Sequence, residues 1–266
     1  MALHYHALHA YRALQKTIFS LTAALLLFAG NTAQAMPIDI VQLAGFINSP
    51  GLGATTLEDT RIGSGVNDVA SAGFDVSFVN NLNADNFGSV TWSLTNRTGA
   101  NLNNVSFFAF LDAEITETGN SFYNEFGERV SVTGSGATDS AADSWEIDEP
   151  GFLFGDIYDN LLAGALDNIN NVPNGLDDDV SLALGFDIGD LLMDQVLVAT
   201  LTISTLNIGG LSHTDPDSLF TYYFNGIAEV IPIEIPLPPT WGLMLLSFVF
   251  LERFKKYSGY KITLNR

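Results

Sequence analysis

The middle of the chain is a series of short segments in which apolar and polar residues alternate. A side chain in a β-strand points to the opposite face from its neighbour, so a period of two predicts strands with one buried face. Gly- and Asn-rich turn signals, such as Asn80-Asn81 and Gly134-Ser135-Gly136, separate the segments. The predicted strands cover residues 73–79, 87–95, 105–111, 129–133, 180–186, 196–204 and 220–230. One short helix is expected over residues 157–167.

Strands at this spacing, with no long helical stretches between them, predict an all-β fold of antiparallel sheets packed as a sandwich. Residues 184–204, LGFDIGDLLMDQVLVATLTIS, resemble the penultimate strand pair of the immunoglobulin-like domains that are common in bacterial surface proteins. This resemblance implies an antiparallel immunoglobulin-like or jelly-roll-type β-sandwich over residues 36–230. Residues 37–72 are expected to form an edge segment or a partly mobile arm.

The first 35 residues have the three parts of a secretory leader in the right order. Arg12 and Lys16 precede an apolar run over residues 18–30, and Ala33-Gln34-Ala35 supplies a small-x-small cleavage site. Signal peptidase is therefore expected to cut between Ala35 and Met36. The pattern predicts an exported protein.

The C-terminal region has a similar division into parts. Residues 231–239 read as an extended linker, because Pro at alternating positions prevents helix formation and strand pairing. Residues 240–251 are an apolar membrane segment, and residues 252–266 are a basic cytoplasmic tail, since positive charge holds that end inside. The apolar run from residue 241 to 251 would span about 16 Å of a hydrocarbon core of roughly 30 Å, which predicts a marginal or temporary anchor.

A short Pro motif, an apolar helix and a basic cluster in this order resemble the PEP-CTERM sorting signal, with Pro236-Leu237-Pro238 in place of Pro-Glu-Pro. The resemblance implies that an exosortase, a membrane-embedded cysteine protease, cuts near the Pro motif. It also implies a Gram-negative host that makes extracellular polysaccharide, transient anchoring in the inner membrane, and a final place in the cell envelope, at the cell surface or outside the cell. The sorting residues would be Pro236, Leu237, Pro238, Trp241, Arg253, Lys255 and Lys256.

Two departures from the family pattern concern processing. Glu252 interrupts the junction between the apolar run and the basic cluster, and ten residues follow Lys256 where the family usually stops sooner. An ordinary single-pass anchor is the alternative interpretation of this tail.

The charge of the chain is concentrated between its two ends. Residues 36–251 contain 29 acidic residues, three arginines and no lysine, a net charge of -26. Such a body is repelled by phosphate backbones and anionic membrane surfaces, which excludes nucleic acid as a partner. Divalent cations are a candidate partner, and solubility is the alternative reason for the charge. The chain has no cysteine, which excludes disulfides and Cys-based metal sites.

Two stretches gather oxygen ligands of the kind that calcium prefers, namely carboxylates and amides. One is Asp177-Asp178-Asp179, and the other runs from residue 111 to 128 and includes Asp112 and Glu114. Neither stretch matches the EF-hand loop. These five aspartates and glutamates are the candidate calcium ligands, and solvated loop carboxylates are the alternative interpretation.

Catalytic patterns are weak. After removal of the leader the only histidine is His213, and Ser212, His213 and Asp215 are too close in sequence to converge as a triad, so this stretch reads as a polar loop between strands. The sequence therefore predicts no enzyme, but a non-catalytic exported surface or matrix protein associated with biofilm or exopolysaccharide. The alternative is a calcium-dependent carbohydrate-binding module, with Trp92 and Trp145 as candidate aromatic contacts. An extracellular hydrolase is the third reading.

Overall fold

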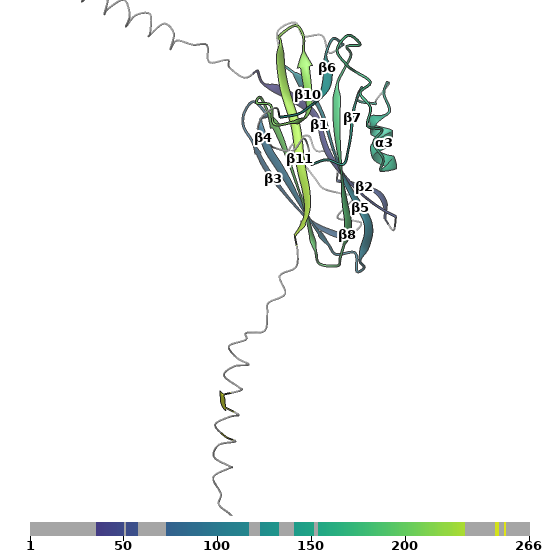
Figure 1. Ribbon diagram of the computed structural model, residues 1–266, viewed down its shortest axis with the longest axis vertical. Coiled ribbons are helices and arrows are strands. Elements are labelled where there is room, and N and C mark those ends of the chain that lie inside the picture. Colours follow the sequence, from purple (N-terminus) through teal and green to yellow (C-terminus); the bar gives the residue numbers. More distant parts are fainter. Residues whose placement is uncertain are drawn as a thin grey trace, which may run out of the picture.

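The computed structural model describes residues 36–50, 52–57, 73–116, 123–132, 141–151 and 154–231, together with Phe248, Val249 and Arg253. These residues form two antiparallel sheets and one short helix (Figure 1), which confirms the predicted all-β sandwich. The predicted leader with Ala33 and Ala35, and the sorting signal apart from Arg253, lie outside the described residues. Within the described part of the chain, no helix has the length and apolar character needed to cross a membrane.

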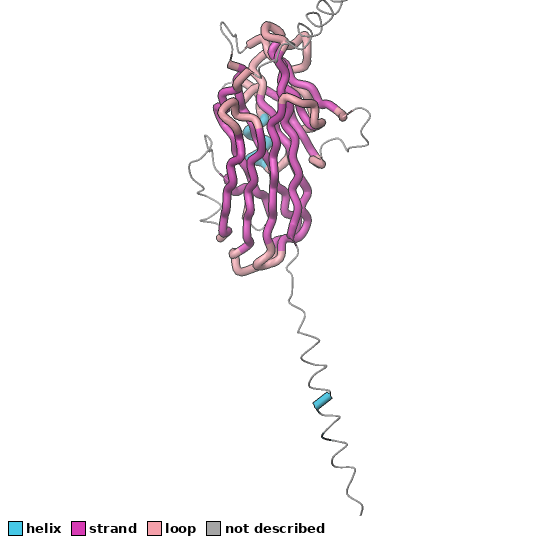
Figure 2. The backbone as a smooth tube through the Cα atoms, turned by 90° about the vertical axis from the view of Figure 1, so that its left-hand side faces the viewer, coloured by secondary structure: helices cyan, strands magenta, loops and turns pink. Residues whose placement is uncertain are grey.

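The strands run along the long axis of the molecule (Figure 2). The first sheet has the order β2-β1-β5-β8-β7, and the second has the order β3-β4-β9-β11-β10-β6. The strands of the first sheet are β1 (Ile38–Ser49), β2 (Gly53–Leu57), β5 (Leu102–Ile115), β7 (Ser144–Asp148) and β8 (Ser181–Leu191). Those of the second are β3 (Phe74–Leu82), β4 (Gly88–Asn96), β6 (Phe126–Val130), β9 (Val196–Ser204), β10 (Gly210–Asp215) and β11 (Phe220–Ile231).

The main hydrophobic core fills the space between the two sheets. In β4 and β9 every second side chain is buried, as the alternating sequence predicts. Trp92 of β4 is only 2% exposed, and its ring lies 6.1 Å from that of Phe107, which in turn lies 6.3 Å from the ring of Phe186. Burial of these large apolar side chains is the dominant favourable contribution to folding. Trp92 is therefore a core residue, as its position in the alternation suggested.

A second, smaller core lies on the outer face of the first sheet, where helix α3 (Ile157–Ala163) covers β1 and β5. Phe46 and Phe110 make edge contacts with Tyr158 at ring distances of 5.8 and 5.9 Å. The helix is shorter than the predicted 157–167, because Gly164 adopts a left-handed conformation with φ 72° and caps its C-terminus.

Several details differ from the sequence prediction. Residues 38–49 are not an edge segment or an arm, because β1 lies inside the first sheet between β2 and β5. The stretch containing Ser212, His213 and Asp215 is not a loop but strand β10. Strand β6 begins at Phe126, earlier than the predicted 129–133, and β7 was not predicted. Strand β8 extends to Leu191, so the expected loop 189–195 is reduced to residues 192–195, which cross from the first sheet to β9 in the second.

Candidate metal centre

Three carboxylates from two neighbouring strands meet at one end of the first sheet. Asp112 and Glu114 are two residues apart on β5, so their side chains lie on the same face. Asp179 comes two residues before Ser181, which pairs with Asp112 in the β5–β8 ladder. One carboxylate oxygen from each of the three lies within 4.8 Å of the others. Strand pairing thus brings together residues that are far apart in the sequence.

These carboxylates are largely removed from water, and oxygens of Glu114 and Asp179 are buried without a hydrogen-bond partner. Asp112 is 2% exposed, and no donor among the described residues reaches its carboxylate. Glu114 Oε2 and Asp179 Oδ1 are both buried and have no hydrogen-bond partner. A buried polar atom without a partner costs about 1–3 kcal/mol, and more when it is charged. Such groups are rare in folded proteins and indicate that something else satisfies them.

The electrostatics of the three groups agree with their geometry. Burial, reinforced by the negative charges of Asp179 and Glu125, raises the pKa of Asp112 to about 7. Burial and repulsion from Glu125, Asp179 and Asp112 raise the pKa of Glu114 to about 8. Burial and Glu125 raise the pKa of Asp179 to about 6. The pKa of each group is raised mainly because the group is buried, and nearby negative charges add to this; a bound cation would offset both effects.

A buried chain of hydrogen bonds lies beside this cluster. Glu125 Oε2 lies 2.6 Å from His213 Nε2, and His213 Nδ1 lies 2.8 Å from the hydroxyl of Tyr222. The Tyr222 hydroxyl donates to the carbonyl oxygen of Ala113 at 3.2 Å. Glu125, His213 and Tyr222 are each fully buried. The chain joins the start of β6 to β10, β11 and β5, and it reaches β5 between the two candidate ligands Asp112 and Glu114.

The direction of the last bond fixes the protons of the chain. Because Tyr222 gives its only proton to Ala113, its oxygen must accept a hydrogen bond from His213 Nδ1–H. His213 Nε2 lies 2.6 Å from the Glu125 carboxylate, so both ring nitrogens have a partner inside the protein. Glu125 thus has a buried side-chain partner, whereas no described donor reaches the carboxylate of Asp112.

The structure gathers three of the five predicted ligands and leaves two outside the group. Asp177 is exposed, and its carboxylate accepts a hydrogen bond from the Gly175 amide at 2.9 Å. The backbone of Asp178 pairs with that of Glu125, with N–O distances of 2.9 and 3.2 Å. The predicted strand 105–111 stopped short of Asp112 and Glu114, which share a face because β5 continues to Ile115; the place of Asp179 depends on strand register, which has no local signal. The tyrosine of the hydrogen-bond chain, Tyr222, was not anticipated.

A second acidic group shows what a satisfied arrangement looks like in the same protein. Carboxylate oxygens of Glu146, Asp156 and Asp167 also lie within 4.8 Å of one another. Here Glu146 accepts hydrogen bonds from Asn160 Nδ2 at 2.9 Å and from the Asp167 amide at 3.1 Å, and the two aspartates are exposed. Each oxygen of the buried member, Glu146, therefore already has a protein donor.

The geometry around His213 does not suit acid–base catalysis with its neighbours. Both ring nitrogens are engaged and the side chain is fully buried. The Ser212 hydroxyl donates to the Glu128 carbonyl at 3.3 Å, and Asp215 accepts from the Asp217 amide and the Ser218 hydroxyl at 2.8 Å each. Ser212, His213 and Asp215 thus serve the packing of β10 and do not converge.

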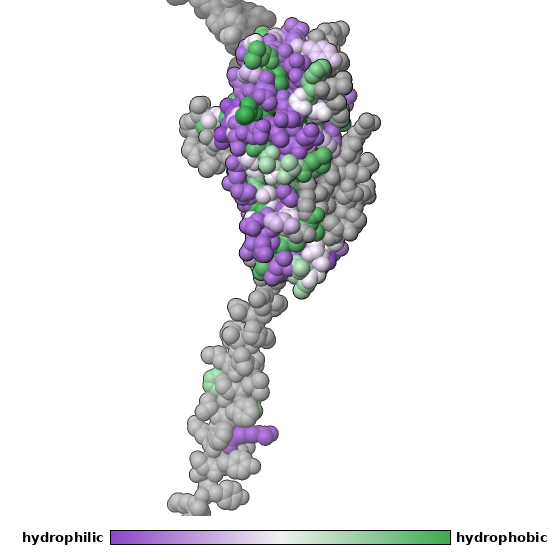
Figure 3. Space-filling view, turned by 90° about the vertical axis from the view of Figure 1, so that its right-hand side faces the viewer, coloured by the Kyte–Doolittle hydropathy of each residue, from purple (hydrophilic) through white to green (hydrophobic). Residues whose placement is uncertain are grey.

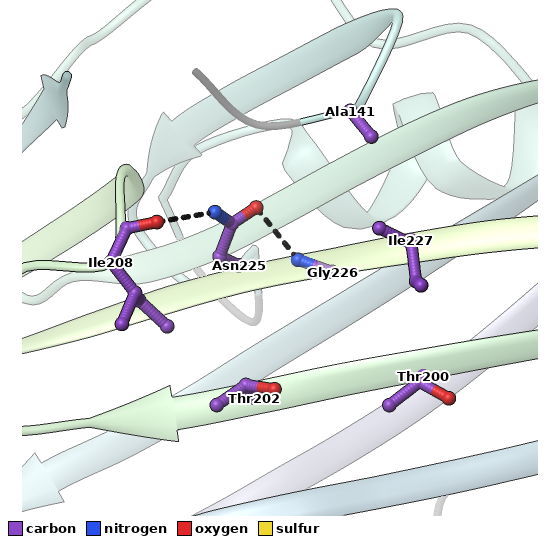
Figure 4. A pocket seen from close by; sticks show the side chains of 7 residues that line it. All are labelled: Ala141, Thr200, Thr202, Ile208, Asn225, Gly226 and Ile227. Carbon is purple, nitrogen blue, oxygen red and sulfur yellow. Dashed lines mark hydrogen bonds between the residues drawn. The ribbon is translucent and has the colours of Figure 1, made fainter. Parts of the chain in front are cut away.

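One pocket lies over β9 and β11 and has a volume of about 310 Å³ (Figure 4). Its lining offers two threonine hydroxyls but no charged side chain, and the Asn225 amide is already bonded to Ile208 O at 2.7 Å and to the Gly226 amide at 2.8 Å. The pocket lining consists of Ala141, Thr200, Thr202, Ile208, Asn225, Gly226 and Ile227.

Figure 3 shows the side of the molecule on which α3 lies, where hydrophilic residues cover much of the described surface and apolar residues form small separate patches.

Comparison with known proteins finds no family model that matches this chain, no curated protein that resembles it and no solved structure that matches it.

Proposed function

We propose that this chain is a non-catalytic exported protein of the cell surface or extracellular matrix, sorted by a PEP-CTERM-like signal, with an immunoglobulin-like or jelly-roll-type sandwich as its body. The observation that carries the proposal is where the folded body ends. Strand β11 ends at Ile231, and the motif Pro236-Leu237-Pro238 follows only five residues later. A protease at the membrane surface would then meet an extended segment directly beside a compact domain.

The proposal of a non-catalytic body is supported by the surroundings of His213 and of the three buried carboxylates. Both ring nitrogens of the histidine are hydrogen-bonded inside the protein, one to Glu125 and one to Tyr222. The buried carboxylates Asp112, Glu114 and Asp179 lie side by side rather than facing each other across a cleft that could hold a sugar. These features favour a structural role for the body.

The sorting part of the proposal is tested by changing the Pro motif. With Pro236→Ala and Pro238→Ala together, we expect export and membrane retention to persist while cleavage stops. Without the two prolines the φ angles are no longer fixed, so the backbone is no longer held extended for the protease. Blots of membrane and medium fractions, in a host with an exosortase and in one without it, measure this. Normal processing of the double variant, or equal processing in both hosts, would show an ordinary anchor.

The basic cluster is expected to have a separate role. Neutral replacements of Arg253, Lys255 and Lys256 should weaken retention in the membrane while the Pro motif stays intact, because these charges oppose passage of the end across the bilayer. The fraction of uncut protein released into the medium is the measurement. Unchanged retention would mean that the apolar run holds the chain without them.

A calcium-dependent carbohydrate-binding module is the second candidate, and Tyr123 favours it. This side chain is 70% exposed and lies two residues before Glu125, whose charge acts on Asp112, Glu114 and Asp179. The two tryptophans fit less well, because Trp92 is buried and the Trp145 ring is covered by the Arg129 guanidinium at 5.4 Å. Calorimetric titration with the host polysaccharide, with and without calcium and in Tyr123→Ala, separates the two candidates. Release of reducing ends from the same polysaccharide would instead indicate the hydrolase reading.

A further inference from the structure

We propose that Asp112, Glu114 and Asp179 bind one calcium ion at the end of the first sheet. The proposal goes beyond the proposed function and does not depend on it, because it rests only on the geometry of the folded body. The three side chains place one oxygen each within 4.8 Å of the others. Two oxygens that each lie about 2.3–2.6 Å from one calcium ion are at most about 5.2 Å apart, so the spacing of these three oxygens fits a shared ion.

The burial of these groups is what distinguishes them from an ordinary acidic surface. Asp112 is 2% exposed and receives no hydrogen bond from the described residues. Glu114 Oε2 and Asp179 Oδ1, in the same cluster, are buried without any partner. In the second acidic group, by contrast, Glu146 has a donor on each oxygen. The first cluster therefore has buried acceptors that no described protein donor satisfies and that a cation would satisfy.

The ligand set selects a hard cation. All three groups are carboxylates, and His213, the nearby nitrogen ligand, is occupied by Glu125 and Tyr222. Oxygen ligands suit calcium, magnesium and manganese rather than zinc or copper. Calcium is the choice because it accepts irregular geometry and six to eight ligands, whereas magnesium demands a near-ideal octahedron. Water and backbone carbonyls would complete its coordination.

The position of the site gives the ion a structural role. Asp112 and Glu114 belong to β5, and Asp179 lies in the segment that leads into β8. That same segment is joined to the start of β6, in the other sheet, by the Glu125–Asp178 backbone pair. A bound ion would hold this segment against β5 and so connect the two sheets where β6 begins.

The test uses the full chain, purified from the cell envelope in detergent and freed of metal with a chelator. Calcium is titrated calorimetrically, and melting is followed with and without the ion, in wild type and in Asp112→Asn, Glu114→Gln and Asp179→Asn. We expect each variant to bind calcium at least about tenfold more weakly than wild type, since affinity follows the number of charged ligands. Without calcium these variants should melt at the same temperature as wild type or higher, because each replaces a carboxylate that lies in a buried cluster with unpartnered oxygens. Asp177→Asn is the matched control from the same loop and should bind calcium like wild type.

Two results would overturn the proposal. The first is a wild-type chain that shows neither binding heat nor a rise in melting temperature at millimolar calcium. The second is an equal loss of affinity in Asp177→Asn and Asp179→Asn, which would indicate a diffuse effect of surface charge. A larger stabilisation by magnesium than by calcium would overturn the choice of ion. Asp179→Asn should leave the melting temperature unchanged or higher without calcium, but should reduce the rise in melting temperature that calcium causes. A residue needed only for folding would instead lower the melting temperature in both conditions.

Discussion

Replacing Tyr222 with Phe removes a single buried oxygen from the hydrogen-bond chain next to the acidic cluster. The change leaves the His213 Nδ1–H without its acceptor at 2.8 Å and the Ala113 carbonyl without a donor at 3.2 Å. The phenyl ring itself keeps its place, because Tyr222 is fully buried in the core between the sheets. A buried donor without a partner costs about 1–3 kcal/mol, so we expect Tyr222→Phe to lower the free energy of unfolding by about 2 kcal/mol.

Urea unfolding of the purified chain, followed by circular dichroism, measures this cost, and Tyr223→Phe is the control. Tyr223 is the next residue of β11, lies on the other face, is half-buried, and its hydroxyl bonds to no described residue. Its replacement should change stability by less than about 0.5 kcal/mol. In a His213→Leu background the cost of Tyr222→Phe should fall by about 1 kcal/mol or more, because the two residues share one bond. Equal costs in both backgrounds, or equal effects of the two tyrosine replacements, would refute the chain of hydrogen bonds described above.

Three further predictions concern other parts of the molecule. Metal-free protein should melt at lower temperature as pH rises from about 5.5 to 8.5, since the raised pKa values of Asp112, Glu114 and Asp179 give stability at low pH that is lost on ionisation. Saturating calcium should flatten this dependence, and a metal-free melting temperature independent of pH would contradict the prediction. Asn96→Ala should lower the free energy of unfolding, measured in urea, by about 2–4 kcal/mol, because this buried side chain bonds Ala100 O, Leu191 O and the amide and hydroxyl of Thr98. A decrease below about 0.5 kcal/mol would mean that water replaces those bonds. Gly127→Ala should cost about 1–3 kcal/mol, because its new methyl group would lie 2.5 Å from Ile147 Cγ2, and an unchanged melting temperature would show that this contact relaxes freely.

The sequence predicts best those strands that bury only one face. In β4 the outer face is polar, and in β9 it is polar from Thr200 onward, so the period of two is visible in the residues themselves. Strand β1 lacks this signal, because Ala44 and Phe46 on its outer face are covered by α3, so both faces are apolar. The tertiary contact that hides the outer face also hides the strand from sequence analysis.

Strand β10 was missed for the opposite reason. Ser212, His213 and Asp215 are polar residues of the kind that usually face water, yet all three are buried here. Their partners come from elsewhere in the chain: Glu128 for Ser212, and Glu125 and Tyr222 for His213. Local composition cannot show that a distant residue will satisfy a buried polar group.

The candidate site was predictable to the same limited extent. The stretch with Asp112 and Glu114 and the run from 177 to 179 were marked as two sources of oxygen ligands, but the predicted strand 105–111 did not include Asp112 and Glu114, which share a face of β5. The choice of Asp179 over its two neighbours follows from the β5–β8 register, where Asp112 pairs with Ser181. Register is set by the fit of two whole strands, so it is a property of the fold and not of either segment.

The place of β11 in the second sheet has a consequence for how the protein is made. The last strand that the structure describes lies between β9 and β10, and not at an edge. A ribosome produces residues 220–231 after every other strand, so the second sheet has a gap in its middle until they emerge. Any nascent chain shorter than this leaves β9 and β10 with unpaired edges and cannot reach the native state. Folding of the described body is therefore a late event in synthesis, because the second sheet cannot be completed before β11 emerges.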